Sequence, residues 1–190
     1  MALLILGIIL FLGAHSLKIA APVRAGLIGR LGDKPYRGLY SVISLVGFGL
    51  IAWGFHDYRA GSWQQIWVPP AGMRHLTITL MWFAFVALAA SGPKPSRIRG
   101  WLRHPMLVGV KIWALAHLLA NGDLGGMILF GSFLAWAVVD RISLKRRGDL
   151  GAARISHFTR TDGVIVVAGT VAYVAMMVLH PYLIGVAVLG

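Results

Sequence analysis

Six long apolar runs, separated by short polar loops, constrain the fold of this chain more than any other feature of its sequence. The runs cover about residues 2–17, 36–55, 76–90, 105–120, 124–139 and the chain from 164 onward. A helix of about 20 apolar residues crosses a bilayer, and only helices or closed barrels satisfy the backbone there. The pattern predicts an all-α polytopic membrane protein, a bundle of about six transmembrane helices in a single domain.

Run length adds two expectations. To cross the bilayer, the shorter runs must be extended by flanking residues or must lie where the bilayer is locally thin. The last run, to residue 190, is too long for one straight crossing. We expect it to break at His180-Pro181, because proline cannot donate the backbone hydrogen bond that continues a helix.

The composition supports a membrane location and excludes several chemistries. The 190 residues are 58% hydrophobic and only 13% charged, too few charges to cover a soluble domain. The absence of Cys excludes disulfides, Cys-ligated zinc and iron–sulfur clusters. The absence of Glu leaves six carboxylates for any acid–base role: Asp33, Asp57, Asp123, Asp140, Asp149 and Asp162.

The net charge of +12 looks like a nucleic-acid signal until the charges are located. Fifteen of the 18 Lys and Arg residues fall in the loops after the first, third and fifth runs. Membrane lipids explain this pattern better, and no nucleic-acid partner is expected. By the positive-inside rule, these loops are cytoplasmic and both termini face outward. The N-terminus lacks a signal-peptide pattern, so the first run should be retained.

Ionisable groups inside the apolar runs are the candidate functional residues. Lys111 and His117 lie within the run 105–120, His104 lies at its entrance, and His15 lies near the end of the first run. Such groups are costly in lipid and usually face a cavity or a partner. Structural alternatives exist, since His104 can begin a helix before a proline, Lys111 can snorkel to the headgroups, and His56 lies at the end of a run.

These residues leave three chemistries open. Neutral imidazoles could ligate heme iron, with Lys or Arg meeting the propionates. The outer histidines could hold a metal ion, or all of them could make interhelical hydrogen bonds in a structural bundle; these outer histidines are His56, His75, His117 and His180. At about 1.5 Å of rise per residue, His15 and His117 differ in depth by about 10 Å, so one flat cofactor would require helix tilt.

Four motifs in order along the chain resemble a known family. They are AHS at 14–16, YRGLYSVISL at 36–45, RHP at 103–105 and IWALAH at 112–117. Together they resemble the NnrU family, bacterial membrane proteins associated with denitrification and nitric oxide metabolism, and its relative zeta-carotene isomerase. The resemblance implies a redox or nitric-oxide-linked role, with a nitric oxide reductase system as a possible partner.

The isomerase is a heme b enzyme, and the resemblance implies that His15 and His117 are axial ligands of the heme iron. It also implies a functional role for His56, and the basic groups Lys111, Arg103 and His104 complete the expected cofactor-binding set. An isomerase-like activity on an apolar small molecule remains an alternative. The isomerase, however, has a cysteine three residues before its second ligand, where this chain has an alanine, so no thiolate ligand switch is expected.

A second resemblance gives a competing expectation. RHPMLVG at 103–109 resembles a motif of integral membrane methyltransferases, which implies that Arg103 and His104 help to hold S-adenosylmethionine. Leu107 replaces the usual tyrosine of that motif, and the acidic pair expected further along is missing. A third expectation is a non-catalytic membrane scaffold or assembly factor.

Overall fold

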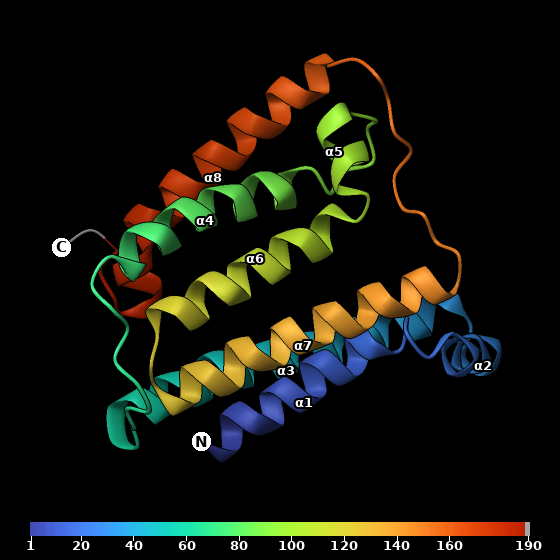
Figure 1. Ribbon diagram of the computed structural model, residues 1–190. Coiled ribbons are helices and arrows are strands. Elements are labelled where there is room, and N and C mark those ends of the chain that lie inside the picture. The colour runs from blue at the N-terminus through green and yellow to red at the C-terminus, as the bar shows by residue number, and fades with distance from the viewer. Residues whose placement is uncertain (189–190) are drawn as a thin grey trace. The chain divides into compact units, whose positions relative to one another are not determined.

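The helices of the protein follow the apolar runs of its sequence. In the computed structural model, which describes residues 1–188, every regular element is an α-helix, and no strand forms apart from one isolated bridge (Figure 1). The helices are α1 (Ala2–Ser16), α2 (Ala21–Leu31), α3 (Asp33–Gly61), α4 (Met73–Ala89), α5 (Arg97–Leu102), α6 (Pro105–Ala120), α7 (Leu124–Arg146) and α8 (Arg160–Ile184). The predicted all-α class is therefore confirmed.

Helix length decides how many of these elements can cross a membrane. Three helices are long and apolar enough, namely α3, α7 and α8, with 29, 23 and 25 residues. The pair α1 and α2 makes a fourth candidate, bent by 86° at its break. Helices α4 and α6 are apolar but have 17 and 16 residues, about 24–26 Å against a hydrocarbon core of about 30 Å. These criteria identify three spans, or four with the bent pair, where the sequence predicts about six.

Two helices form where the sequence predicts loops. In α2, a proline occupies the first turn, where its missing N–H is not needed and its fixed φ suits a helix. In α5, the Ser96 hydroxyl accepts a hydrogen bond from Arg99 N at 3.0 Å and caps the helix. Both helices are short and carry basic residues, so hydrophobic periodicity does not reveal them.

The predicted break at His180-Pro181 is wrong. Helix α8 continues through Pro181 to Ile184 and ends at Gly185, which has φ +77°. Because Pro181 lies in the last turn, only one backbone hydrogen bond is lost, and Gly185 N donates to Pro181 O at 3.0 Å to close the helix. Residues 189–190 of the predicted run lie outside the described chain.

The contacts of the chain group into two compact units. The first unit comprises Met1–Trp67 and Gly122–Trp136, and the second comprises Val68–Asn121 and Ala137–Gly190. The boundary falls in α7, after Trp136. Each unit has its own set of helix contacts.

In the first unit, glycines bring the backbones of α1 and α3 into contact. A Cβ atom on Gly47 would lie 2.7 Å from Phe11 N, and one on Gly54 would collide with the backbone of Leu4. Gly7 on α1 meets α3 in the same way. Small residues allow this approach between membrane helices.

In the second unit, α4 packs against both α6 and α8. Three side-chain hydrogen bonds join these helices, and each has its donor or acceptor on α4. Thr77 Oγ1 donates to Ala116 O at 2.9 Å, Trp82 Nε1 donates to Thr170 Oγ1 at 3.0 Å, and Tyr173 OH donates to Ile78 O at 3.1 Å. Polar side chains thus join α4 to both of its neighbours.

The close approach of α1 and α3 gives a first prediction. We expect Gly54→Ala to destabilise the protein by about 1–3 kcal/mol, because the added methyl group must displace the backbone of Leu4. The measurement is the thermal unfolding midpoint in a mild detergent.

Gly49→Ala is the matched control on the same helix. A Cβ atom at Gly49 meets nothing within 4 Å, so the better helix propensity of Ala should leave stability equal or slightly higher. Equal midpoints for the two variants would contradict the glycine contact.

Candidate functional site

His15 lies in the last turn of α1, in the first unit. Its Nδ1 lies 2.7 Å from the carbonyl oxygen of Phe11, one turn earlier. Its ring stacks on Phe11, with centroids 4.2 Å apart, and contacts the rings of Tyr40 and Trp136 at 5.3 and 6.0 Å. A half-buried imidazole therefore lies among aromatic side chains from three helices.

His117 lies in the last turn of α6, in the second unit. Its Nδ1 lies 2.8 Å from the carbonyl oxygen of Trp113, and the two rings are 5.3 Å apart. The carbonyl oxygen of His117 accepts from both the backbone and the side-chain nitrogens of Asn121, each at 2.8 Å. The end of α6 and the orientation of this imidazole are thus fixed together.

The bond from Nδ1 determines what both imidazoles can do. A backbone carbonyl only accepts hydrogen bonds, so Nδ1 must carry the proton in each ring. In a neutral imidazole the lone pair then lies on Nε2. Metal-ligating histidines are commonly oriented by a bond of this kind from the other ring nitrogen. His15 and His117 both have the tautomer needed to ligate through Nε2.

A strained turn connects α5 to α6 at Arg103. This residue has φ +60° and ψ −57°, and His104 N donates to Leu102 O across it at 2.6 Å. These values match the rare γ-turn with a positive central φ. Arg103 is the only non-glycine residue with positive φ among residues 1–188. A conformation of this kind costs about 1–3 kcal/mol and must be held by its surroundings.

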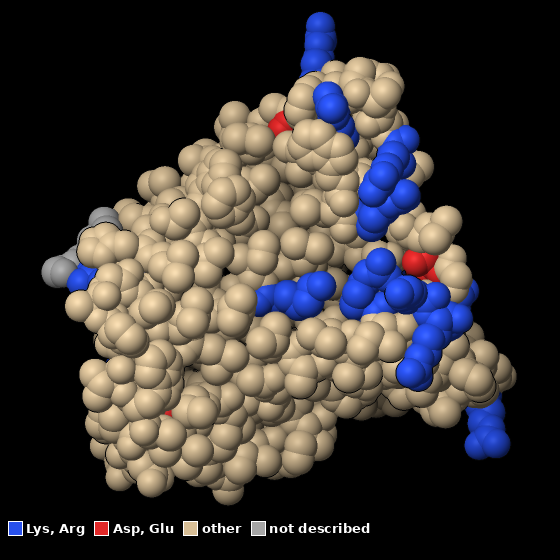
Figure 2. Space-filling view, viewed as in Figure 1, with Lys and Arg blue, Asp and Glu red and all other residues tan. Residues whose placement is uncertain are grey.

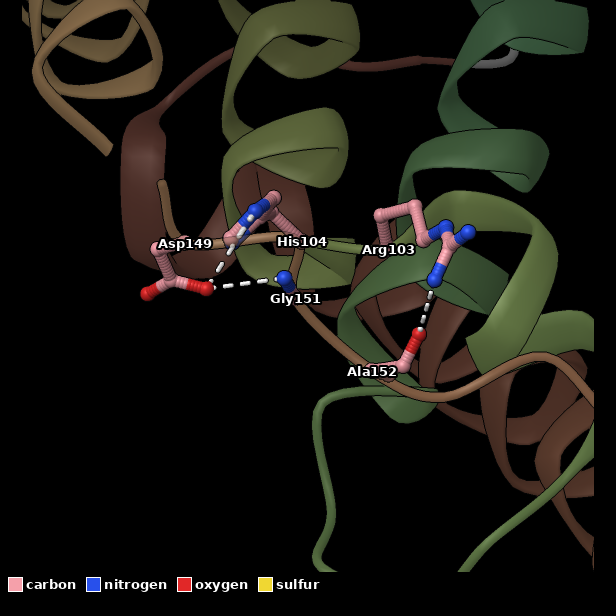
Figure 3. Close-up of polar contacts among 5 residues, drawn as sticks. All are labelled: Arg103, His104, Asp149, Gly151 and Ala152. Carbon is pink, nitrogen blue, oxygen red and sulfur yellow. Dashed lines mark hydrogen bonds and ion pairs between the residues drawn. The ribbon is translucent and has the colours of Figure 1, made fainter. Parts of the chain in front are cut away.

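The segment after α7 supplies those surroundings (Figure 3). Ala152 N donates to Arg103 O at 2.8 Å, and Arg103 Nη1 donates to Ala152 O at 3.0 Å. Asp149 Oδ1 accepts from Gly151 N at 2.8 Å and lies 3.9 Å from His104 Nε2. The His104 side chain is 11% exposed. Arg103 therefore holds this loop by two hydrogen bonds, whereas His104 approaches Asp149 at a distance too long for a hydrogen bond.

Two further predicted cofactor-binding residues, Lys111 and His56, do not take part in the contact of Arg103 and His104 with the loop after α7. Lys111 is partly buried in the middle of α6, and no carboxylate within residues 1–188 forms a salt bridge with it. His56 is exposed on α3, in the first unit. Their predicted roles therefore rest on the family resemblance and on position in the chain.

Most of the six carboxylates have structural partners. Asp33 pairs with Arg37 at 2.8 Å. Asp123 is buried and accepts from Gly126 N at 2.8 Å at the start of α7. Asp162 is buried and accepts three backbone hydrogen bonds. These roles leave little evidence for acid–base catalysis by an aspartate.

No three His or Asp side chains within the described residues come together as a metal-ion site. The expectation of a metal site formed by the outer histidines therefore has no support in the structure. Heme iron needs only two axial protein ligands, so this result does not test it.

Sequence reasoning missed the partner of the RHP motif. Asp149 lies 45 positions after His104 in a loop without periodicity, and no sequence signal pairs the two. The aromatic ring set around His15 was also missed, although Tyr40 lies in the YRGLY motif. A scan for aromatic residues one turn before each histidine would have found Phe11 and Trp113.

The protein is all-helical, and its long apolar helices are those of a membrane helical protein in length and composition. The NnrU protein family model matches residues 3–188, nearly the whole chain. The chain therefore belongs to the NnrU family. No curated protein and no solved structure matches it.

The loop that holds Arg103 gives a second prediction. A Cβ atom on Gly151 would collide with Arg103 O and lie 2.8 Å from His104 Nε2, and its φ of +70° also disfavours any side chain. We expect Gly151→Ala to release the loop and to speed amide exchange at Ala152 by roughly tenfold or more, about 1–3 kcal/mol. Hydrogen–deuterium exchange of peptides covering 149–154 measures this.

Gly148→Ala separates the effect of the atomic collision from the effect of the positive φ. Gly148 has φ +75°, but a Cβ atom there would meet nothing within 4 Å, so this variant keeps the conformational cost without the collision. Exchange at Ala152 should stay near the wild-type rate in this variant. Equal acceleration in both variants would show that Gly151 does not support the Arg103 turn.

Proposed function

We propose that this NnrU-family protein binds heme b through Nε2 of His15 and Nε2 of His117 in a bacterial inner membrane. The observation that carries the proposal is that each of the two histidines makes the same kind of hydrogen bond. Nδ1 of His15 donates to Phe11 O, and Nδ1 of His117 donates to Trp113 O. A structural histidine can make the same bond. Two such bonds on the two histidines that the family motifs select are what favours ligation.

The surroundings of the two imidazoles fit a flat apolar group. Phe11, Tyr40 and Trp136 surround His15, and Trp113 lies against His117. These rings would exclude water and hold each imidazole in place. Lys111, partly buried on the same helix as His117, would meet a propionate. His56, Arg103 and His104 remain candidates for the same role at the helix ends.

Bound heme b would supply one-electron redox chemistry. His15 and His117 would hold the iron, and ligation by two histidines would favour electron transfer. We therefore propose a redox role linked to nitric oxide and denitrification metabolism, in support of a nitric oxide reductase system. An isomerase-like activity on an apolar small molecule is the second possibility. Buried Ala114 offers no thiolate for a ligand switch.

The membrane arrangement that we propose has six crossings. Helices α1, α4 and α6 would cross where the bilayer thins locally or where flanking residues extend the span. The support is the alternation of charge, since basic residues gather in every second loop. This arrangement places both termini in the periplasm.

The third prediction tests the heme proposal. Protein purified in mild detergent from cells with ample heme should show a Soret band that sharpens and shifts on reduction. His15→Ala and His117→Ala should each lower heme affinity by about 100-fold or more, because losing a group that merely orients a metal ligand already costs about 10- to 100-fold. The measurement is heme content by absorbance, before and after reconstitution.

His75→Ala and His157→Ala are the controls, since both residues are exposed and neither belongs to the family motifs. Both should keep the wild-type heme content. A wild-type protein that gains no Soret band on reconstitution would refute the proposal and favour the scaffold alternative. Heat of binding on titration with S-adenosylmethionine would instead favour the methyltransferase alternative, for which the structure adds no support.

A further inference from the structure

The guanidinium group of Arg97 lies against two exposed aromatic rings. Its Cζ atom lies 4.8 Å from the ring centroid of Trp101 and 4.5 Å from that of Phe158. The two rings meet edge to face, with centroids 5.7 Å apart. Trp101 is 54% exposed and Phe158 is 60% exposed. We call these three residues the Arg97 cluster.

The backbone around the Arg97 cluster is fixed by Asp162. Its carboxylate accepts from Arg97 N at 3.2 Å, from Ile98 N at 2.8 Å and from Thr159 N at 2.7 Å. Asp162 is 4% exposed. It therefore joins the start of α5, which carries Arg97 and Trp101, to the start of α8, next to Phe158.

A second contact holds the same two segments together. Gly100 on α5 lies so close to the following loop that a Cβ atom would lie 2.6 Å from Ala153 O and 3.0 Å from Arg154 Cα. The segment 153–158 therefore packs directly against α5. Both rings are held in position before any partner arrives.

Within residues 1–188, no acidic side chain neutralises the charge of Arg97. Asp162 bonds to the backbone nitrogen of Arg97 and not to its guanidinium group. No carboxylate among residues 1–188 lies within salt-bridge distance of that group. Its N–H donors therefore remain available to an anion, while both rings lie within 5 Å of its Cζ atom.

Other basic side chains surround the Arg97 cluster. Lys94, Arg99, Arg154 and Arg160 lie on the same short segments. In the space-filling view, several Lys and Arg side chains lie near α5 and the loop after α7 (Figure 2). This is the side that the charge asymmetry of the sequence predicts to be cytoplasmic.

We propose that the Arg97 cluster binds the phosphate headgroup of an anionic phospholipid. An indole and a phenyl ring beside a cation, at the charged end of apolar helices, match the membrane interface, where aromatic rings settle at headgroup level. The guanidinium group can donate two parallel hydrogen bonds to a phosphate. A protein partner is less favoured, because Phe158 lies just before α8, a helix long and apolar enough to cross a membrane. This proposal does not depend on heme.

The fourth prediction tests this site with full-length protein in a neutral detergent. Titration with dioleoyl phosphatidylglycerol, followed by native mass spectrometry, counts bound lipid. We expect Arg97→Gln to weaken binding of this lipid by about fivefold or more, the size expected for one basic group at a membrane surface. Phe158→Ala should also weaken binding, although it keeps every charge. Dioleoyl phosphatidylcholine should bind weakly to all of these proteins.

Two variants separate a built site from general attraction. Lys94→Gln removes one exposed charge from the same loop and should change affinity less than about twofold. Arg97→Lys keeps the charge but loses the planar group, so it should bind between the wild type and Arg97→Gln. Unchanged melting temperatures in detergent without lipid would show that the variants are folded.

Three results would overturn the proposal. The first is an equal loss of affinity in Lys94→Gln and Arg97→Gln, which would mean that only total charge matters. The second is wild-type affinity in Arg97→Gln. The third is displacement of the lipid by an equal concentration of soluble glycerol phosphate, which would indicate a site for a free anion and not for a lipid.

Discussion

A polar group on an apolar helix must find its hydrogen-bond partner within the protein, and both units are organised by this requirement. His15 and His117 meet it within their own helices, through the carbonyl one turn earlier. Thr77, Trp82 and Tyr173 meet it between helices. The hydrogen bonds within a helix orient the imidazole rings, and the hydrogen bonds between helices hold α4 against its neighbours. The same physical demand therefore supports both the candidate site and the fold.

The scarcity of carboxylates gives a second organising constraint. The chain has six aspartates and 18 Lys and Arg residues. Two of the aspartates hold the segment between α7 and α8. Asp149 lies against the start of α6, and Asp162 binds the start of α5. Because six carboxylates cannot neutralise 18 basic groups, most of the positive charge has no counter-ion within the sequence. The surface charge is then available to anions outside the chain.

Much of the fold could be predicted from sequence, because apolar runs have a simple physical consequence. The run 105–120 coincides with α6, and the run 2–17 matches α1 within one residue. The prediction failed where local chemistry outweighs hydrophobicity, as in the Ser96 cap of α5 and the final turn at Pro181. The candidate histidines could be selected from sequence, but their tautomers required the Phe11 and Trp113 carbonyls. The contact between His104 and Asp149 depends on tertiary structure and has no local signal.

The glycine contact between α1 and α3 has a consequence for the imidazole of His15. Phe11 is the residue whose backbone touches Gly47, and it is also the residue whose carbonyl oxygen accepts the proton of His15 Nδ1. The orientation of the His15 ring therefore depends on the contact between Phe11 and Gly47, which lies on α3, 32 residues after His15. Because Gly47 has no side chain, α1 can approach α3 closely at Phe11, and this close approach helps to orient the imidazole of His15.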